Sequence, residues 1–419
     1  MVSSRSGWLA IVLFTACGLG VAGKTTAQEQ QPATSEPAPQ DGDSAALVEF
    51  LRNTKVAVNM DGYYAWNTNR PIGRVNLLRA YDVTSNNFSL NQAGLIVDHA
   101  PDPDQGRRAG LRFDLMYGQA TETLQGSAQN EPRPQVYRPV FQAYGSYVFP
   151  VGSGLQVDFG KFASALGVEN NYTKDQINYS RSYFFNFLPF YHMGVRATYT
   201  PDSAVSLTYW LVNGAQQTED FNGFKSQAAI ITLKPASSVI WNVNYYTGRE
   251  GRDLVPDLNP GQTLLPTQPG LSTQPAVNPD RSRLHILDTY ASWNVTQKLT
   301  LLAEGDYVTV RGAASNSPRV FGGAAYAQYR MTPIVHVGAR TTYMSDHDGL
   351  FSGVGQNLHD LTGTVTWFAD PRFMIRGEVR RDWSTVPFFL TDVPGDRSRS
   401  QTTFTAGLVW WIGNKEGIW

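Results

Sequence analysis

The chain of 419 residues has little charge and almost no cysteine. Charged residues make up 16% of it, against about 25% in a typical soluble domain. The formal net charge is −1, which argues against a strongly basic protein that binds nucleic acid. Because Cys17 is the single cysteine, an exported form of the chain has no internal disulfide and must be stable by other means.

Long apolar runs and enzyme motifs are missing as well. No segment after the N-terminal region approaches the roughly 18 consecutive apolar residues of a transmembrane helix. G-x-S-x-G, H-E-x-x-H and Gly-rich phosphate loops do not occur in a supporting context. The residues Asp346-His347-Asp348 have ligand chemistry for a divalent ion, but an acidic surface loop explains them more simply. The sequence therefore predicts no enzyme, no cofactor and no metal site.

The N-terminus is typical of an export signal. Arg5 precedes a short apolar run at residues 8–21, and small residues ending at Ala27 fit a cleavage site. This predicts a cleaved signal peptide over residues 1–27. An alternative is lipidation at Cys17, because the four residues ending there resemble a bacterial lipoprotein box.

A polar segment follows the signal. Residues 28–54 form a Pro/Gln-rich linker, with a short helix expected over 44–53 and Ser44 as its N-cap. After it, helical periodicity stops, and the rest of the chain, 55–419, is predicted to be one domain.

Alternating apolar and polar residues dominate that domain. In residues 373–380, Phe, Ile, Gly and Val interleave with Met, Arg, Glu and Arg. Because successive side chains of a strand point to opposite faces, such a segment has one apolar and one polar face. About sixteen such segments occur, each about 10–14 residues long, which is enough for a tilted strand to cross a bilayer. They start near Val56, Phe88, Arg108, Val140, Gly154, His192, Ala204, Ser226, Val239, Leu284, Leu299, Val320, Ile334, Leu358, Phe373 and Thr402.

The connections between these segments alternate between short and long. Tight turns such as 150–153 and 234–237 alternate with long loops such as 249–281 and 385–400. This pattern is typical of outer-membrane barrels, and an open sheet in lipid would leave its edge groups unpaired. The sequence predicts an all-β fold: a closed antiparallel up-and-down transmembrane β-barrel of about 16 strands around a water-filled lumen.

Aromatic residues gather near the ends of the expected strands. This placement is typical of the interfacial girdles of membrane barrels, although strands favour aromatics in general. The residues are Trp66, Tyr117, Phe149, Tyr199, Tyr245, Trp293, Trp367, Trp383 and Trp410.

Several short motifs resemble those of the putative β-barrel porins, second family, which are bacterial outer-membrane proteins similar in style to phosphate-selective porins. The motifs are GYYAW at 62–66, NFSLNQA at 87–93, GKF at 160–162, GVE at 167–169, YSRS at 179–182, PFYHMGVR at 189–196, VNG at 212–214 and YYTG at 245–248. The resemblance covers most of residues 56–413. It implies a channel and supplies no catalytic residues.

The stretch Gly160–Thr200 contains the most unusual connection in the chain. Roughly 30 residues rich in aromatics, Asn and charge separate two strands, and loops of that length usually have a function. The strand count makes loop 163–191 the third long loop, and the resemblance to sixteen-stranded porins implies that it folds inward as a constriction. The alternative is a loop packed on the outer rim. Its charged residues are Glu169, Lys174, Asp175 and Arg181.

Strand parity identifies charges on the polar, lumen-facing side of the barrel. The cations are Arg112, Arg196, Arg330, Arg340, Arg376 and Arg380, and the anions are Asp288, Glu304 and Asp306. One hypothesis is that a basic wall faces the loop and gives a transverse field with a weak anion preference. The other is that these charges pair with one another and keep the lumen wet.

The predicted function is a porin of the bacterial outer membrane that lets small hydrophilic solutes or ions diffuse passively. The alternatives are a non-conducting structural or adhesin barrel and a barrel hydrolase. An energy-coupled transporter is disfavoured because residues 28–55 are too few for a plug domain. The expected partners are outer-membrane lipids and lipopolysaccharide, the barrel-insertion machinery through the last strand, small solutes and, as in many sixteen-stranded porins, two further copies in a homotrimer; nucleic acid is not among them.

Overall fold

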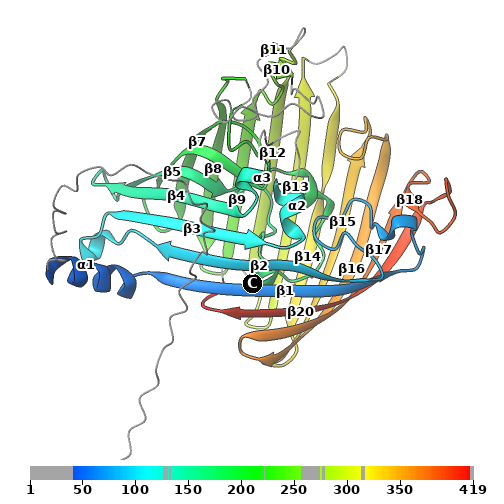
Figure 1. Ribbon diagram of the computed structural model, residues 1–419, viewed down its shortest axis with the longest axis horizontal. Helices are drawn as coiled ribbons and strands as arrows, with labels where there is room; N and C mark the ends of the chain where they lie inside the picture. The colour runs from blue at the N-terminus through cyan, green and yellow to red at the C-terminus, as the bar shows by residue number, and fades with distance from the viewer. Residues whose placement is uncertain are drawn as a thin grey trace, which may run out of the picture. The chain divides into compact units, whose positions relative to one another are not determined.

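The computed structural model describes residues 41–125, 131, 134–220, 222–255, 274–275, 279–312 and 317–415. Sixteen strands form a closed antiparallel barrel in which each strand pairs with its neighbours along the chain and β20 closes the ring onto β1 (Figure 1). The predicted fold class and strand number are thus confirmed. The barrel strands are β1 (Lys55–Asn67), β2 (Asn87–His99), β3 (Ala109–Tyr117), β4 (Val140–Phe149), β5 (Leu155–Ala163), β6 (Tyr191–Tyr199), β7 (Val205–Val212), β8 (Ser226–Ala236), β9 (Val239–Gly248), β12 (Arg283–Asn294), β13 (Leu299–Arg311), β14 (Arg319–Arg330), β15 (Val335–Asp346), β16 (Gln356–Asp370), β17 (Phe373–Ser384) and β20 (Ser400–Ile412).

Short elements lie in the connections. They are α1 (Asp41–Arg52), η1 (Ile72–Arg74), η2 (Pro103–Gln105), α2 (Ala120–Gln125), α3 (Pro134–Tyr137), η3 (Thr173–Asp175), α4 (Tyr183–Phe187), and the strand pairs β10 (Leu254–Val255) with β11 (Gln274–Pro275) and β18 (Phe389–Leu390) with β19 (Arg397–Ser398). Among the helices that the structure describes, none has the length and apolar character to span a membrane.

The helix expected over 44–53 corresponds to α1, but its start differs. The helix begins at Asp41, so Ser44 lies within the helix and is not its N-cap. The predicted signal segment, most of the linker and the C-terminal residues 416–419 lie outside the described residues.

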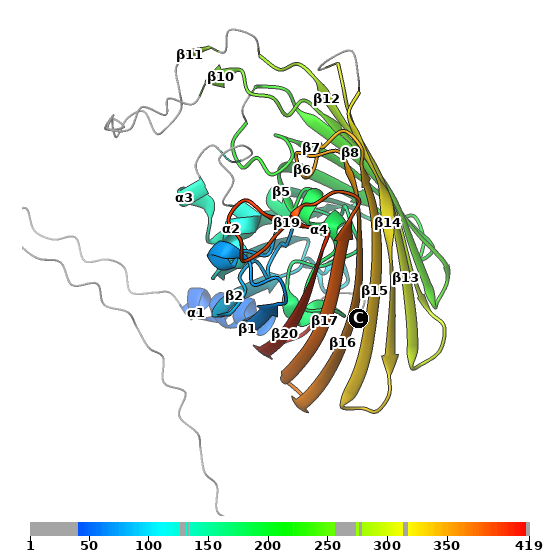
Figure 2. The ribbon, with the colours of Figure 1, turned by 90° about the vertical axis from the view of Figure 1, so that its right-hand side faces the viewer.

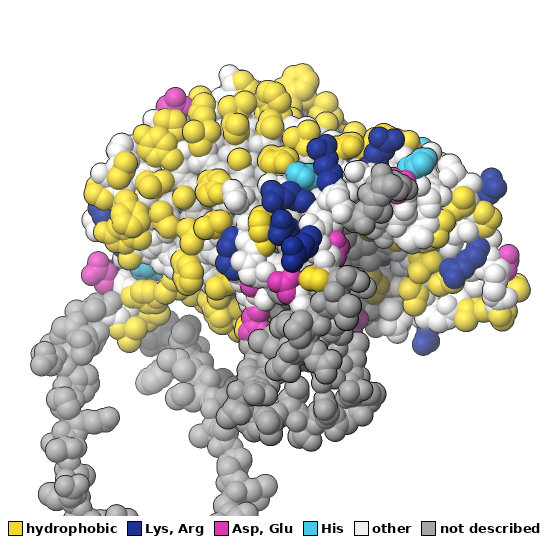
Figure 3. All heavy atoms as spheres, turned by 90° about the horizontal axis from the view of Figure 1, so that it is seen from above, with side chains coloured by type: hydrophobic (Ala, Val, Ile, Leu, Met, Phe, Trp, Pro, Cys, Tyr) yellow, Lys and Arg dark blue, Asp and Glu magenta, His cyan; other side chains and the backbone are white. Residues whose placement is uncertain are grey.

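The alternation read from the sequence separates the two faces of the barrel wall. On β16, Asp360, Thr362 and Thr364 are buried toward the interior, whereas Leu361 and Val365 are exposed on the outside. Figure 3 shows hydrophobic side chains covering a continuous part of one face, with Lys and Arg side chains gathered in a separate group. The exposed aromatics of the outer face near strand ends include Trp66, Tyr117, Phe149, Tyr245, Trp293, Trp367, Trp383 and Trp410.

The long connection between β5 and β6 is called L3 here and comprises residues 164–190. Two glycines face each other near its base, because Gly160 and Gly194 are direct partners in the β5–β6 register. Gly160 has φ of 139°, which strains any L-residue, and a Cβ there would lie 2.3 Å from the Ala143 carbonyl oxygen. Glycine is therefore required where the two strands lead into the loop.

Candidate functional site

L3 crosses the interior of the barrel. It leaves the wall at β5 and returns at β6, yet its helix α4 lies against β15 and its turn η3 lies against β1 and β20 (Figure 2). In the order of strands around the ring, β15 is on the opposite side from β5 and β6. The loop therefore reaches the far wall and divides the lumen.

Three arginines of the far wall bind the loop through its backbone carbonyl oxygens. Arg376 on β17 donates to Thr173 at 2.8 Å and also to Gln176. Arg340 on β15 donates to Ser180 at 2.7 Å. Arg380 on β17 donates to Arg181 at 2.5 Å; the three wall arginines are at most 2% exposed. They are covered by L3, and Arg376 also borders a small cavity at the short-turn end of the wall.

One carboxylate of the same wall binds loop amides. Glu378 on β17 accepts hydrogen bonds from the backbone N–H groups of Tyr179, at 2.6 Å, and Ser180, at 3.0 Å. The Tyr179 hydroxyl donates to Asp61 on β1 at 2.8 Å. Charge-assisted bonds of this kind are roughly twice as strong as neutral ones, so β1 and β17 hold the middle of L3 firmly.

Two of the three wall arginines also pair with carboxylates that the sequence had not singled out. Arg340 lies 3.2 Å from Asp360, and Arg380 lies 2.8 Å from Asp382. Arg79, from the loop between β1 and β2, contacts Asp382 at 2.5 Å from the other side. The charges of this wall therefore alternate in sign, which is the arrangement of the second hypothesis drawn from the sequence. A uniformly basic wall is not what the residues form.

The charged residues of L3 are engaged within this arrangement. Glu169 lies 3.4 Å from Arg340 and accepts from the Ser182 amide at 2.7 Å. Lys174 and Asp175 form a buried ion pair at 2.6 Å. Arg181 donates to the Tyr179 and Asn170 carbonyl oxygens, at 2.8 and 3.2 Å, and its guanidinium lies 4.9 Å from the centre of the Tyr81 ring.

The aromatics of L3 pack against the interior of the barrel. Tyr183, Phe184 and Leu188 join a buried cluster that includes Phe162 and Trp210. A second cluster contains Tyr81, Phe141, Tyr172, Phe185, Phe190 and Tyr191. Because these side chains cannot leave the cluster without exposing apolar area, they add to the hydrogen bonds that fix the loop.

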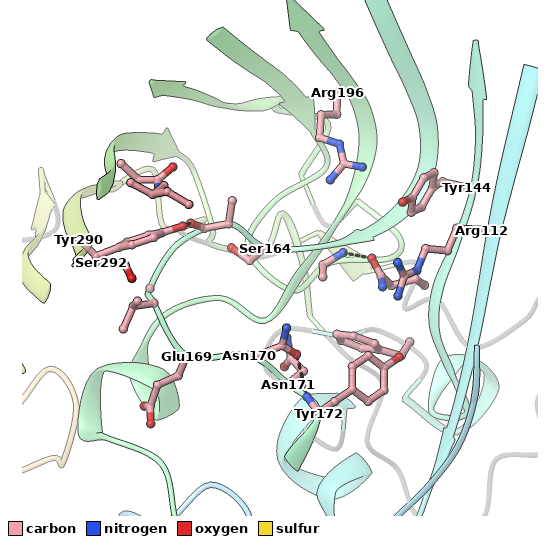
Figure 4. A pocket seen from close by; sticks show the side chains of 18 residues that line it. Arg112, Tyr144, Ser164, Glu169, Asn170, Asn171, Tyr172, Arg196, Tyr290 and Ser292 are labelled. Carbon is pink, nitrogen blue, oxygen red and sulfur yellow. Dashed lines mark hydrogen bonds between the residues drawn. The ribbon is translucent and has the colours of Figure 1, made fainter. Parts of the chain in front are cut away.

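A cavity of about 400 Å³ remains between L3 and the near wall. Figure 4 shows Arg112, Tyr144 and Arg196 on its strand side and Asn170, Asn171 and Tyr172 on its loop side. Arg112 pairs with Asp114 at 3.0 Å, and Arg196 pairs with Asp158 at 2.7 Å. The side chains of these two arginines keep 14% and 21% of their area exposed, so both present positive charge to the cavity.

A second cavity, of about 240 Å³, lies at the short-turn end of the far wall. Arg330, His336, Arg376 and Lys415 line it together with neutral residues. Burial, together with the like charge of Arg376, lowers the pKa of Lys415 to about 8. No carboxylate is among its lining residues in the described part of the chain, so this cavity is suited to an anion.

The acidic residues predicted on β12 and β13 lie together. Ligand oxygens of Asp288, Glu304 and Asp306 are within 4.8 Å of one another, and the three side chains are buried. Strand parity placed each of them on the lumen side but did not bring them together as one group. They lie beneath the start of L3, where Gly167 and Val168 donate backbone N–H groups to Asp288 and Glu304.

Histidines offer one arrangement that resembles a nucleophile and its base. His192 Nε2 lies 3.3 Å from Ser164 Oγ, and its Nδ1 lies 3.0 Å from the Gly214 carbonyl oxygen. A carbonyl holds the ring but cannot supply the negative charge that a triad carboxylate supplies.

In the loop between β15 and β16, Asp346 accepts from the Ser352 amide and hydroxyl, while His347 contacts Asp348 at 3.1 Å. Asp346 is thus used to close its own loop.

Several residues of the site were missed by the sequence reading. Asp360, Glu378 and Asp382 are on lumen-facing positions of β16 and β17, so strand parity was a signal that could have found them. Arg79 in a loop and Lys415 beyond the last strand carried no such signal. Their roles depend on contacts with residues far away in the sequence.

Comparisons with known proteins give a consistent result. A profile of the family described as "Putative beta-barrel porin-2, OmpL-like" matches residues 53–410. Among solved structures, OmpT of Vibrio cholerae, described as an outer membrane protein, is similar with a TM-score of 0.50 and 10% identity, over 86% of this chain and 97% of that chain. Its trimer form gives 0.51 and 9%, over 86% and 99%. The anion-selective porin from Comamonas acidovorans gives 0.50 and 10%, over 86% and 99%. A search of curated protein sequences gives no match.

Proposed function

Because the chain belongs to the OmpL-like putative beta-barrel porin-2 family, as its motifs predicted, we propose that it is a passive diffusion porin of the bacterial outer membrane. Small hydrophilic solutes or ions cross through the lumen beside L3. The predicted loop 163–191, which contains L3, is the constriction. A closed barrel is one of only two kinds of structure that satisfy every backbone group in lipid, and at this strand number its lumen is wide enough for water.

The observation that carries the proposal is the path of L3. The loop is bound to the far wall by Arg340, Arg376, Arg380 and Glu378, while a polar cavity of about 400 Å³ remains on the near side. A loop without a role in the lumen could pack on the rim of the barrel and would not need these buried contacts. A loop tied down across the lumen restricts the size of what can pass.

A weak anion preference is part of the proposal. It comes from charges at the two cavities and not from a basic far wall. Arg340 and Arg380 of the far wall are covered by L3 and paired with carboxylates, so they contribute little to the field that a solute meets. Arg112 and Arg196 reach the larger cavity, and Arg330 and Lys415 reach the smaller one. Positive charge at these two places attracts anions through the remaining space.

Direct measurements distinguish a porin from two other functions. A structural or adhesin barrel would not conduct. A barrel hydrolase would turn over ester or peptide substrates, and the Ser164–His192 contact is the place where such activity would have to reside. Since the His192 ring faces a carbonyl oxygen where a triad has a carboxylate, we expect no hydrolysis.

The remaining parts of the proposal concern the surroundings of the barrel. Residues 1–27 direct export and are removed after Ala27, with lipidation at Cys17 as the alternative that mass spectrometry of the mature protein distinguishes. The exposed outer face contacts membrane lipid and lipopolysaccharide, and the last strand is the part that the insertion machinery binds. Three copies assemble into a trimer, which crosslinking in native membranes tests.

Single-channel conductance in planar bilayers tests the proposed function. The wild type is compared with a variant that lacks residues 170–187. We expect a conducting wild type and a larger, less selective conductance in the deletion. A wild type that does not conduct would overturn the porin proposal, and an unchanged conductance in a deletion variant that is folded would overturn the role of L3 as constriction.

A further inference from the structure

The acidic group beneath the start of L3 has no counter-charge within the described structure. Asp288 and Asp306 are direct partners in the register of β12 and β13, and Glu304 is two residues from Asp306 on the same face. Their ligand oxygens lie within 4.8 Å of one another, and none of the side chains is more than 6% exposed. None of the ion pairs found among the described residues reaches any of them.

Neutral donors satisfy only part of this group. Asp288 Oδ2 accepts from the Gly167 amide at 2.9 Å and from Asn244 Nδ2 at 2.7 Å. Glu304 accepts from the Val168 amide at 3.1 Å and from a tyrosine hydroxyl at 3.3 Å. Within the described residues, Asp288 Oδ1 and both carboxylate oxygens of Asp306 are buried without a hydrogen-bond partner. Three carboxylates at this spacing repel one another strongly unless a cation or protons compensate them.

A buried amide beside the acidic group also has an oxygen without a partner in the described structure. Asn244 on β9 is the register partner of Asp288 and is fully buried. Its Nδ2 donates to Asp288 and to the Ala165 carbonyl oxygen, but its Oδ1 has no donor in the part of the chain described. Protons shared among the carboxylates would leave this amide oxygen unpaired. Because the same amide group contacts Asp288 through its nitrogen, an ion bound between Asn244 and the carboxylates would satisfy this oxygen.

From this geometry we propose that Asp288, Glu304, Asp306 and Asn244 form a binding site for a divalent cation of the Ca²⁺ type. All four ligands are hard oxygen donors, without the nitrogen or sulfur that zinc prefers. Ca²⁺ binds oxygens at about 2.3–2.6 Å, so ligands on opposite sides of the ion are about 5 Å apart, which fits the 4.8 Å spread of the cluster. The flexible coordination of Ca²⁺ tolerates this strand-borne arrangement better than the octahedral demand of Mg²⁺.

The position of the site gives it a structural consequence. The carboxylates that would hold the ion also accept the backbone N–H groups of Gly167 and Val168. The ion would therefore fix the first residues of L3 to β12 and β13, next to the larger cavity, which both of these loop residues line. The binding site itself does not depend on the proposed transport function.

Binding of Ca²⁺ and Tb³⁺ to the full mature chain tests the site. The protein is refolded in detergent without lipopolysaccharide, which itself binds divalent ions, and is then treated with EDTA. Calorimetry with Ca²⁺ measures stoichiometry, and Tb³⁺ luminescence excited through the nearby Tyr290 and Tyr326 reports the place of binding. We expect one Ca²⁺ per chain, which displaces Tb³⁺ from a luminescent site.

Two matched variants decide the outcome. Asp306→Asn keeps the shape of the side chain and removes a ligand charge, so we expect at least about a tenfold loss of Ca²⁺ affinity. Asp98→Asn changes a carboxylate on β2, and its Ca²⁺ affinity should equal that of the wild type. Heat-modifiable migration on gels verifies that both barrels are folded. If the wild type shows no saturable binding, or if folded Asp306→Asn binds as tightly as the wild type, the proposal is wrong.

Discussion

Arg340 on β15 donates a hydrogen bond of 2.7 Å to the carbonyl oxygen of Ser180, which lies 160 residues earlier in the chain. The same guanidinium pairs with Asp360 on β16 at 3.2 Å. One side chain thus joins the barrel wall to the loop that crosses the lumen. A buried arginine in this position needs partners for all its N–H groups, and the loop carbonyl supplies one that the wall lacks.

Glu378→Gln is expected to loosen L3. The carboxylate accepts from the Tyr179 and Ser180 amides on its two oxygens, whereas a glutamine amide has only one oxygen and turns N–H toward the other donor. An unsatisfied buried donor costs about 1–3 kcal/mol. We expect a higher and noisier single-channel conductance. Asp98→Asn, which has no hydrogen bond to L3 among those found, is the control; equal traces for the two variants would contradict the anchoring role.

Gly407→Ala is expected to push L3 away from β20. A Cβ at Gly407 would lie 2.4 Å from the Tyr179 ring, whereas a Cβ at Gly377 would meet nothing within 4 Å. Forcing extra volume into a packed interior costs about 1–3 kcal/mol. The temperature at which the barrel loses its heat-modifiable form should fall for Gly407→Ala and stay unchanged for Gly377→Ala. The same melting temperature in both variants would show that Tyr179 does not pack there.

Arg196→Gln is expected to weaken the anion preference. Its guanidinium lies at the larger cavity, and its loss leaves Asp158 without its cation. A unit charge at about 8 Å contributes about 0.5 kcal/mol in water, with opposite sign for an anion and a cation, so the ratio of anion to cation permeability should change by about fivefold. Reversal potentials in a salt gradient measure this ratio. Arg397→Gln, on the exposed loop pair β18–β19, should leave the permeability ratio unchanged. Clear cation selectivity of the wild type would contradict an anion preference.

The barrel itself could be predicted from the sequence because its signals are local. Lipid on one side and water on the other impose a period of two on each strand, and each of the sixteen barrel strands starts within two residues of the expected place. The pairing of Asp288 with Asp306 was also within reach, because the two are equally distant from the tight turn that joins β12 and β13. Reading register as well as parity would have brought these residues together.

The path of L3 could not be predicted in the same way. Its position depends on contacts such as Arg376 with Thr173, 203 residues apart, that no local pattern encodes. Parity placed Arg340 and Arg376 on the lumen side, but it does not say whether a lumen-facing arginine meets solute or a folded loop. The hypothesis of a basic wall therefore named arginines that do face the lumen, but it did not include the carboxylates and the loop carbonyl groups that contact them.

The anion preference is expected to depend on pH through Lys415. Burial and Arg376 lower its pKa to about 8, with Lys174 and Arg330 as further like charges and Asp175 as an opposing one. As the pH rises from 7 to 9, the ammonium in the smaller cavity becomes neutral, so the anion-to-cation permeability ratio should fall.

The stability of the barrel should change in the opposite sense. Between the folded pKa near 8 and the ordinary lysine value, the unfolded chain binds more protons than the folded one, so stability rises with pH.

Lys415→Met removes the titrating group and is expected to show a permeability ratio that does not change between pH 7 and pH 9. Reversal potentials at pH 6.5, 7.5, 8.5 and 9.5 measure both proteins, and a wild-type curve that is as flat as that of Lys415→Met would show that this cavity does not contribute to selectivity.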